Sequence, residues 1–186
     1  MKFEYKFCMP NHLTFEMNPV QKLLDELLPL NDKKIIDPFS NRNHIYASIT
    51  NDIDVSKDTN YNMCALEFLR IFESSSVDVV LFDPPYSLRQ LKEVYSGIGQ
   101  SLTHSHTTTY FSDVKNEIKR IVKPGGLVYS FGWSSVGMGN NRNFSKIQIL
   151  LLNHGGYHND TIIVKETKNQ DLEKWGLNIQ EGCFLW

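Results

Sequence analysis

Asp83, Pro84, Pro85 and Tyr86 form the stretch of the sequence best suited to chemistry, and they follow the apolar run 77–82. The run predicts a buried strand, and the two prolines prevent it from continuing as a strand or turning at once into a helix. The corner presents a carboxylate, backbone carbonyls and an aromatic ring at the carboxyl end of a strand, where open α/β sheets bind ligands. A Pro-Pro turn with a capping Asp and a surface Tyr is the alternative.

A nucleobase amine suits these groups. The Asp83 carboxylate and the Pro84 carbonyl could each accept one N–H of an exocyclic amine, which leaves the nitrogen aimed at an electrophile. Tyr86 could stack on the base once it has turned out of its helix.

A second corner, Asp37-Pro38-Phe39, follows the short apolar run that ends at Ile36. The turn after it, 40–43, contains no glycine. Asparagine tolerates the left-handed backbone region better than most residues, so Asn41 and Asn43 are expected to be able to adopt it there. An ordinary strand-to-loop turn is the alternative.

The Asp-Pro-Pro-Tyr corner resembles the signature of S-adenosylmethionine-dependent amino-methyltransferases, especially DNA adenine-N6 enzymes, and Asp-Pro-Phe resembles their first cofactor motif. A glycine-rich turn usually follows that motif in the family, and the resemblance implies that Asn41 and Asn43 take the place of its glycines. The resemblance covers roughly residues 14–166. It implies an α/β fold of class I methyltransferase (Rossmann-like) type, with a mostly parallel sheet and a terminal antiparallel hairpin. It also implies S-adenosylmethionine as cofactor and a flipped adenine in DNA as substrate.

The resemblance assigns roles to individual residues. The catalytic residues it implies are Asp83, Pro84, Pro85 and Tyr86. The cofactor-binding residues are Asp37, Pro38, Phe39, Asn41, Asp52, Cys64, Ala65 and Asp83. Asp52 also follows from position, because an acid after the second strand of a nucleoside-binding unit commonly accepts the ribose hydroxyls; Asp54 is its alternate, and a polar capped turn is the other interpretation. Cys64 is as readily a core residue.

Four further residues are candidates for substrate binding. Trp133 lies between a strand and a glycine-rich loop and could form a wall for the target base, or act as a hydrophobic plug. His158 and Asn159 resemble the last motif of the family, although a plain hairpin tip is an equal interpretation. Arg142 is expected to contact phosphate.

Strands alternating with helices must position these residues, which indicates a mostly parallel sheet in a single catalytic domain over 1–186. Strands are expected at 3–7, 44–50, 77–82, 127–131, 147–152 and 161–164, and around Ile35 and Ile36. Helices are expected at 18–28, 62–72, 87–95 and 113–122. Residues 96–112 are expected to be a flexible substrate loop, and residues 167–186 a C-terminal tail.

Composition restricts the interpretation further. The 19 basic and 21 acidic side chains nearly cancel, whereas an autonomous nucleic-acid binder usually has a basic face. A homodimer or a specificity subunit is therefore an expected partner.

The three cysteines form no CxxC pair and His104 and His106 have no partnering acids, so no metal site is expected. No secretory signal or 18-residue apolar run occurs, so a cytoplasmic protein without membrane contact is expected.

Three rival functions remain open. An rRNA guanine-N2 methyltransferase, with RNA as partner, can carry an Asp-Pro-Pro-aromatic corner. A DNA cytosine-N4 methyltransferase is the nearest chemical neighbour. The third rival is an inactive methyltransferase-fold subunit of a nucleic-acid-binding complex, which the glycine-free turn and Cys64 favour.

Overall fold

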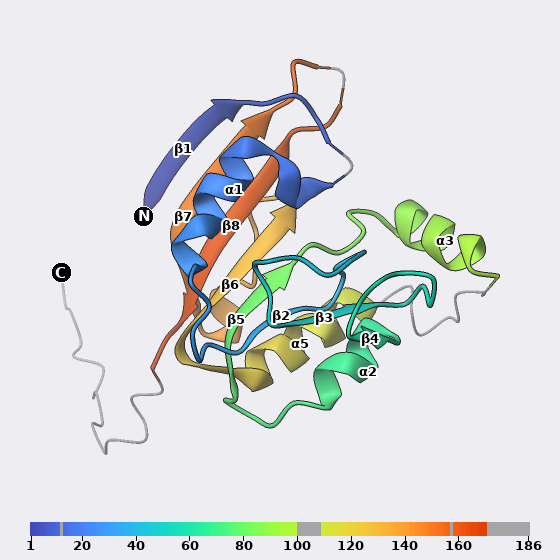
Figure 1. Cartoon of the computed structure of the whole chain (residues 1–186). Helices are drawn as coiled ribbons and strands as arrows, with labels where there is room; N and C mark the ends of the chain where they lie inside the picture. Colours follow the sequence, from blue (N-terminus) through green and yellow to red (C-terminus); the bar gives the residue numbers. More distant parts are fainter. Residues whose placement is uncertain (12, 100–108, 157, 171–186) are drawn as a thin grey trace.

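A twisted sheet with helices on both faces dominates the fold (Figure 1). The computed structural model describes residues 1–11, 13–99, 109–156 and 158–170. In this part of the chain the strand order is β1-β7-β8-β6-β5-β2-β3-β4. The strands are β1 (Lys2–Phe7), β2 (Ile35–Asp37), β3 (Ile49–Asp52), β4 (Tyr61–Asn62), β5 (Val77–Phe82), β6 (Val122–Gly132), β7 (Phe144–Asn153) and β8 (Thr161–Lys168).

The sheet is mostly parallel. Strands β4, β3, β2, β5 and β6 pair in parallel, and β8 is antiparallel to both β6 and β7. The predicted mostly parallel α/β sheet with a terminal antiparallel hairpin is therefore confirmed. The hairpin does not form the edge, however, because β1 pairs in parallel with the outer side of β7.

Helices α1 (Asn18–Leu24), α2 (Ala65–Arg70) and α5 (Tyr110–Ile121) flank the sheet, and α3 (Leu88–Gly97) lies beyond the carboxyl end of β5 (Figure 1). Short 3-10 helices occur at Thr14–Glu16, Asp25–Leu27 and Asn140–Arg142. Strand β5 shows why two cores form. Val80 and Phe82 point into a cluster with α2, α3 and α5, whereas Val79 and Leu81 point into a cluster with α1. Successive side chains of a strand alternate between faces, so an apolar run supplies both cores at once.

The predicted helices all occur, but their bounds differ. The α-helix at 18–28 ends at Leu24 and tightens into a 3-10 turn, which leaves Leu28 exposed. The helix at 62–72 is shorter, because its regular part begins only after Cys64. The helix at 113–122 begins earlier, at Tyr110, because Tyr110 joins Val114, Ile118 and Ile121 in one buried stripe.

Two strand predictions were wrong in detail. Residues 44–48 form turns, and β3 starts only at Ile49; Ser48 instead bonds the backbone of Ile35 through its amide and its hydroxyl. Strand β6 begins at Val122 rather than at Leu127, and its pairing with β5 shifts across the Lys-Pro-Gly-Gly segment.

The predicted loop and tail lie only partly within the described residues. Helices α3 and α5 take up both ends of the predicted 96–112 loop, while residues 100–108, including His104 and His106, lie outside the described part. Strand β8 extends to Lys168, into the predicted tail, and residues 171–186 lie outside. Among the described helices, none combines the length and apolar character needed to span a membrane.

Candidate active site

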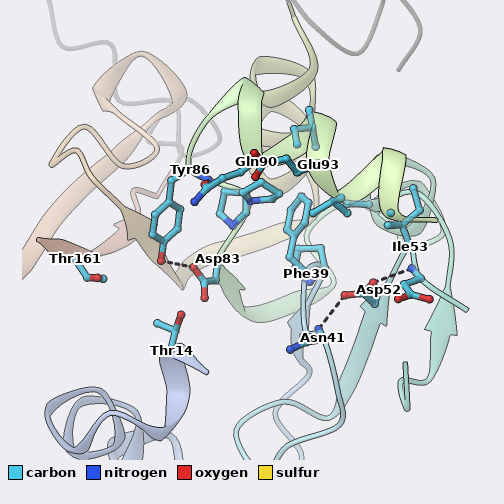
Figure 2. A pocket seen from close by; sticks show the side chains of 18 of the residues that line it. Thr14, Phe39, Asn41, Asp52, Ile53, Asp83, Tyr86, Gln90, Glu93 and Thr161 are labelled. Atoms are coloured by element: carbon cyan, nitrogen blue, oxygen red, sulfur yellow. Dashed lines mark hydrogen bonds between the residues drawn. The ribbon is translucent and has the colours of Figure 1, made fainter. Parts of the chain in front are cut away.

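A cavity of about 1070 Å³ opens at the carboxyl ends of β2, β3 and β5 (Figure 2). Both proline corners border it, as do the end of β3 and the start of β8. The sequence-predicted residues that line it are Pro38, Phe39, Asn41, Asp52, Ala65, Asp83, Pro84, Pro85, Tyr86, Trp133, His158 and Asn159. Asp37, Cys64 and Arg142 do not line it.

Asp83 and Tyr86 form a bonded pair in the cavity wall. The Tyr86 hydroxyl donates to Asp83 Oδ1 at 2.6 Å, and Thr14 faces the same carboxylate (Figure 2). Burial raises the pKa of Asp83 to about 6, a rise that hydrogen bonds from Tyr86 and Thr14 oppose and the charge of Asp37 reinforces. Burial also raises the pKa of Tyr86, so this phenol stays protonated and keeps its donor role.

The backbone around Tyr86 is fixed by the helix that follows. Gln90 Oε1 accepts the Tyr86 amide at 2.7 Å, and the Ser87 hydroxyl caps α3 by accepting from the Gln90 amide at 3.2 Å. The Tyr86 ring meets the Trp133 ring edge to face, with centroids 5.6 Å apart and an interplanar angle of 76°. Tyr86 thus contributes both its hydroxyl and its ring to the wall, whereas the sequence indicated the ring alone.

The Asp37 carboxylate holds the backbone of the first corner, Asp37-Pro38-Phe39, through a hydrogen bond. Its carboxylate is fully buried; Oδ1 accepts the Phe39 amide at 2.9 Å and Oδ2 lies 3.0 Å from His44 Nε2. Both oxygens therefore have protein partners, and the corner presents Pro38 and Phe39 to the cavity in place of Asp37.

The glycine-free turn has a left-handed residue at one position. Asn41 has φ = 57°, as expected of an asparagine that substitutes for glycine. Asn43 is not among the described residues with positive φ, so the same expectation for Asn43 was wrong. Its side chain instead bonds Asp58 at 3.3 Å and also contacts Thr50.

Asp52 closes β3 with its carboxylate held by two amides (Figure 2). Oδ2 accepts from Asn41 N–H at 3.1 Å and Oδ1 from Asp54 N–H at 2.8 Å. Burial raises the pKa of Asp52, although both amide bonds act in the opposite direction. Each oxygen retains a lone pair for a further donor, so the group is preoriented to accept hydrogen bonds in the cavity beside Ile53.

Cys64 and Arg142 contribute elsewhere. The sulfur of Cys64, the residue that precedes α2, lies 3.7 Å from the hydroxyl of Tyr110, the first residue of α5. The Arg142 guanidinium bonds Asn116, Ser112 and the Met138 carbonyl. These contacts tie the segment after β6 to α5, so the structure does not bring Arg142 to the cavity.

Sequence reasoning missed Thr14, His154 and Thr161, all of which line the cavity. Thr14 belongs to a 3-10 turn before α1, and Thr161 is the first residue of β8. His154 is almost fully buried, at 3% exposure. No local motif marks these residues, because they come to the cavity from segments that are distant from the corner in sequence: Thr14 from the turn before α1, and His154 and Thr161 from the two ends of the β7–β8 connection. Among the described residues, no group of three or more His, Cys, Asp and Glu side chains could hold a metal ion.

Comparisons with known proteins address the fold. No protein-family model matches the sequence, and no curated protein is significantly similar to it. TrmN from Thermus thermophilus superimposes with a TM-score of 0.53 at 15% identity, over 82% of this chain and 49% of that one. This chain thus spans about half the length of TrmN.

A second solved structure is similar over more of its own length. The 1,6-didemethyltoxoflavin-N1-methyltransferase of Burkholderia thailandensis, crystallised with 1,6-didemethyltoxoflavin and S-adenosylhomocysteine, gives a TM-score of 0.51 at 7% identity, over 82% of this chain and 78% of that one. Together with the strand order, these similarities show that the chain has the class I, Rossmann-like methyltransferase fold.

Proposed function

We propose that the protein is an S-adenosylmethionine-dependent methyltransferase that acts on the N6 amine of adenine in DNA. The observation that carries the proposal is that one cavity joins the Phe39 corner and Asp52 to the Asp83–Tyr86 corner. A cofactor site and a base site would then share one space, as methyl transfer requires. Fold alone would not support this activity, since one fold hosts many functions.

The cofactor half of the cavity suits a nucleoside. The Asp52 carboxylate, preoriented by the Asn41 and Asp54 amides, is placed to accept from vicinal ribose hydroxyls. Ile53 and Phe39 supply apolar surface for a purine. When bound, S-adenosylmethionine supplies a methyl group whose bond to sulfur breaks with its electron pair on sulfur.

Residues at the other half orient the acceptor. Asp83 accepts one N–H of the target amine, which turns the nitrogen lone pair toward the methyl group. Tyr86 holds the carboxylate through the 2.6 Å bond to Oδ1 and Thr14 also bonds it, so the substrate amine would use a remaining lone pair of the carboxylate. The nitrogen sheds one proton as it forms its new bond to carbon. With a pKa of about 6, Asp83 can take this proton and release it to water near neutral pH.

Trp133 and Tyr86 make the walls for the base. Trp133 is 42% exposed although its ring edge contacts Tyr86, and an exposed aromatic face can stack on an extrahelical base. His158 and Asn159 line the same side of the cavity and are exposed. A homodimer or a specificity subunit is proposed to supply target recognition, since the net charge is only −2.

The test is mass spectrometry of nucleosides from DNA and rRNA incubated with protein and cofactor. N6-methyladenine in DNA is the expected product. N4-methylcytosine in DNA would instead indicate a cytosine-N4 methyltransferase, and N2-methylguanine in rRNA would indicate a guanine-N2 methyltransferase. Asp83→Ala and Tyr86→Ala should abolish the product, while Asp78→Asn, on the same strand but paired with Lys123, should keep it. No product and no cofactor binding at millimolar concentration would favour an inactive subunit.

A further inference from the structure

Strand β1 forms one border of the sheet and carries an exposed aromatic stripe (Figure 1). Phe3, Tyr5 and Phe7 are 61%, 59% and 63% exposed. Successive side chains of a strand point to opposite faces, and on β1 the alternate residues are charged and line a groove against α1: Lys2, Glu4 and Lys6. An exposed border strand with apolar side chains is a ready template for pairing with another chain.

The backbone of β1 can pair on its outer side. Backbone groups of successive residues in a strand point to opposite sides, and the Cys8 amide bonds the Asn153 carbonyl of β7 at 3.1 Å. By this alternation, the amides and carbonyls that point away from β7 belong to the aromatic residues, Phe3, Tyr5 and Phe7. Within the described residues, no strand pairs with this outer side.

Charge selects one register for pairing with a second copy of β1. Antiparallel registers that place aromatic residues opposite aromatic residues join the outward backbone groups and keep all the rings on one face. In one of them Tyr5 faces the partner's Tyr5 and Phe3 faces the partner's Phe7. The same register brings Glu4 opposite the partner's Lys6, twice by symmetry. A slip of two residues would instead oppose Glu4 to the partner's Glu4 or Lys6 to the partner's Lys6, and like charges directly opposite are destabilising.

The Glu4 carboxylate is available for this pairing. Its Oε1 accepts from Gln148 Nε2 at 2.6 Å and lies 2.7 Å from Lys2 Nζ. The hydrogen bond from Lys2 holds the pKa of Glu4 below its ordinary value, so the group is charged at neutral pH. Both contacts use Oε1, which leaves Oε2 for the partner's Lys6.

We propose that β1 is a dimer interface, at which it pairs antiparallel with β1 of a second copy of this chain, centred on Tyr5, so that the two sheets become one. The inference is independent of the proposed function. Strand β1 runs in the direction of the strands that end at the cavity, so the two cavities open at opposite edges of the joined sheet. Target recognition then falls to the specificity subunit rather than to the second copy.

Exchanged charges test the register. Sedimentation of the full chain from low to high micromolar concentration should show a dimer of the wild type. Lys6→Glu and Glu4→Lys each oppose like charges twice, and each should raise the dimer dissociation constant by at least about tenfold. A mixture of the two variants should dimerise again, because at positions 4 and 6 every lysine of one then faces a glutamate of the other.

A second pair of variants tests the aromatic stripe. Tyr5→Thr keeps a residue that favours strands and removes the central ring, so the dimer should be lost. Ile71→Thr is the matched control, because Ile71 is also an exposed apolar residue, at 51%, but follows α2. It should leave the dimer dissociation constant unchanged.

Amide hydrogen exchange gives a readout within β1 itself. Exchange at Phe3, Tyr5 and Phe7 should slow as the protein concentration rises, whereas exchange at Glu4 and Lys6, whose amides point to β7, should not change. A wild type that stays monomeric at high micromolar concentration would refute the proposal, and slow exchange at the three aromatic residues in that monomer would assign the border to another segment of this chain. A dimer that is as tight in Lys6→Glu as in the wild type uses a different surface and would refute it too.

Discussion

Asp83 shows a conflict between stability and chemistry at the level of one residue. It is a carboxylate in a cavity wall whose pKa is raised to about 6 by burial. The folded protein therefore binds its proton more tightly than the unfolded chain, in which the pKa is near the ordinary value of 3.8. Its contribution to stability is fully present below about pH 4 and is lost as the pH rises through 6.

Replacement by asparagine should reveal this cost. Asp83→Asn keeps an oxygen to accept the Tyr86 hydroxyl but cannot ionise. Its free energy of unfolding should match that of the wild type near pH 4 and exceed it by about 2 kcal/mol at pH 8, while methyl transfer is lost. Denaturant titrations of both proteins across this range measure the difference. Asp78→Asn is the control of opposite sign, because the pKa of Asp78, a partner of Lys123, is lowered.

The Tyr86 hydroxyl should set the acid limit of the reaction. Tyr86→Phe keeps the ring against Trp133 but removes the donor to Asp83 Oδ1, and that bond lowers the Asp83 pKa. The titration midpoint of the Asp83 carboxyl carbon in NMR should rise above that of the wild type, and activity should decline at a correspondingly higher pH. An unchanged midpoint would mean that the hydroxyl does not hold the carboxylate.

At the level of elements, two loops fix the cavity walls by different means. The turn after β2 relies on the left-handed Asn41, whose amide also orients Asp52. The loop after β6, which carries Trp133, is anchored at Glu166: this fully buried carboxylate accepts from Met138 N–H at 2.5 Å and Gly139 N–H at 3.2 Å. Lys115 Nζ also donates to the Gly137 carbonyl at 2.7 Å.

Substitutions at Asn41 should separate backbone strain from side-chain contacts. Asn41→Gly and Asn41→Ala both keep the amide that bonds Asp52. Glycine should leave the stability within about 0.5 kcal/mol, whereas alanine in the left-handed region should cost about 1 kcal/mol and weaken cofactor binding measured by calorimetry. Equal effects of the two variants would show that the amide side chain, and not φ, matters at this position.

The Glu166 anchor predicts a steep cost at Gly137. A Cβ there would lie 2.2 Å from Glu166 Oε2 at a φ of +59°. Gly125 has a φ of +79° with nothing within 4 Å of a Cβ, so Gly125→Ala is the matched control with backbone strain alone. Gly137→Ala should lower the free energy of unfolding by at least about 2 kcal/mol more than Gly125→Ala. Similar losses of stability in the two variants would mean that the loop accommodates the added methyl group at little cost.

Elements were predictable where apolar periodicity fixes them. The run 77–82 and the helical stripe at Val114, Ile118 and Ile121 occur as expected. Boundaries shifted where a contact distant in sequence decides, as at Ser48, which bonds Ile35, and Tyr110, which joins the core of α2. For the same reason the two corners could be found from sequence, but Thr14, His154 and Thr161 could not.

At the level of the whole molecule, charge limits how DNA could be held. The lining of the cavity includes Lys57 together with the acidic residues Asp54 and Glu93, and the nitrogens of Lys115 and Arg142 already bond protein oxygens. The described surface around the cavity thus offers few free cations to phosphates.

DNA binding should accordingly depend weakly on salt. A plot of log affinity against log salt concentration should have a slope no steeper than about −3, equivalent to about three phosphate contacts. Fluorescence anisotropy with a labelled duplex at several salt concentrations measures it, with a single-stranded oligonucleotide of the same sequence as control. A much steeper slope would require a basic surface from a partner or from residues outside the described part.

Strand β1 is an exposed edge strand of the sheet, and Cys8, which follows it, contacts His154 in the wall of the cavity. Phe3, Tyr5 and Phe7 are each about 60% exposed along it, while the Cys8 amide bonds Asn153 at 3.1 Å and the Cys8 carbonyl holds the His154 ring. Border strands open more readily than central ones. Each fraying of this strand would break the contact between the Cys8 carbonyl and the imidazole, so amide hydrogen exchange along residues 2–8 would report how often this part of the cavity wall loosens.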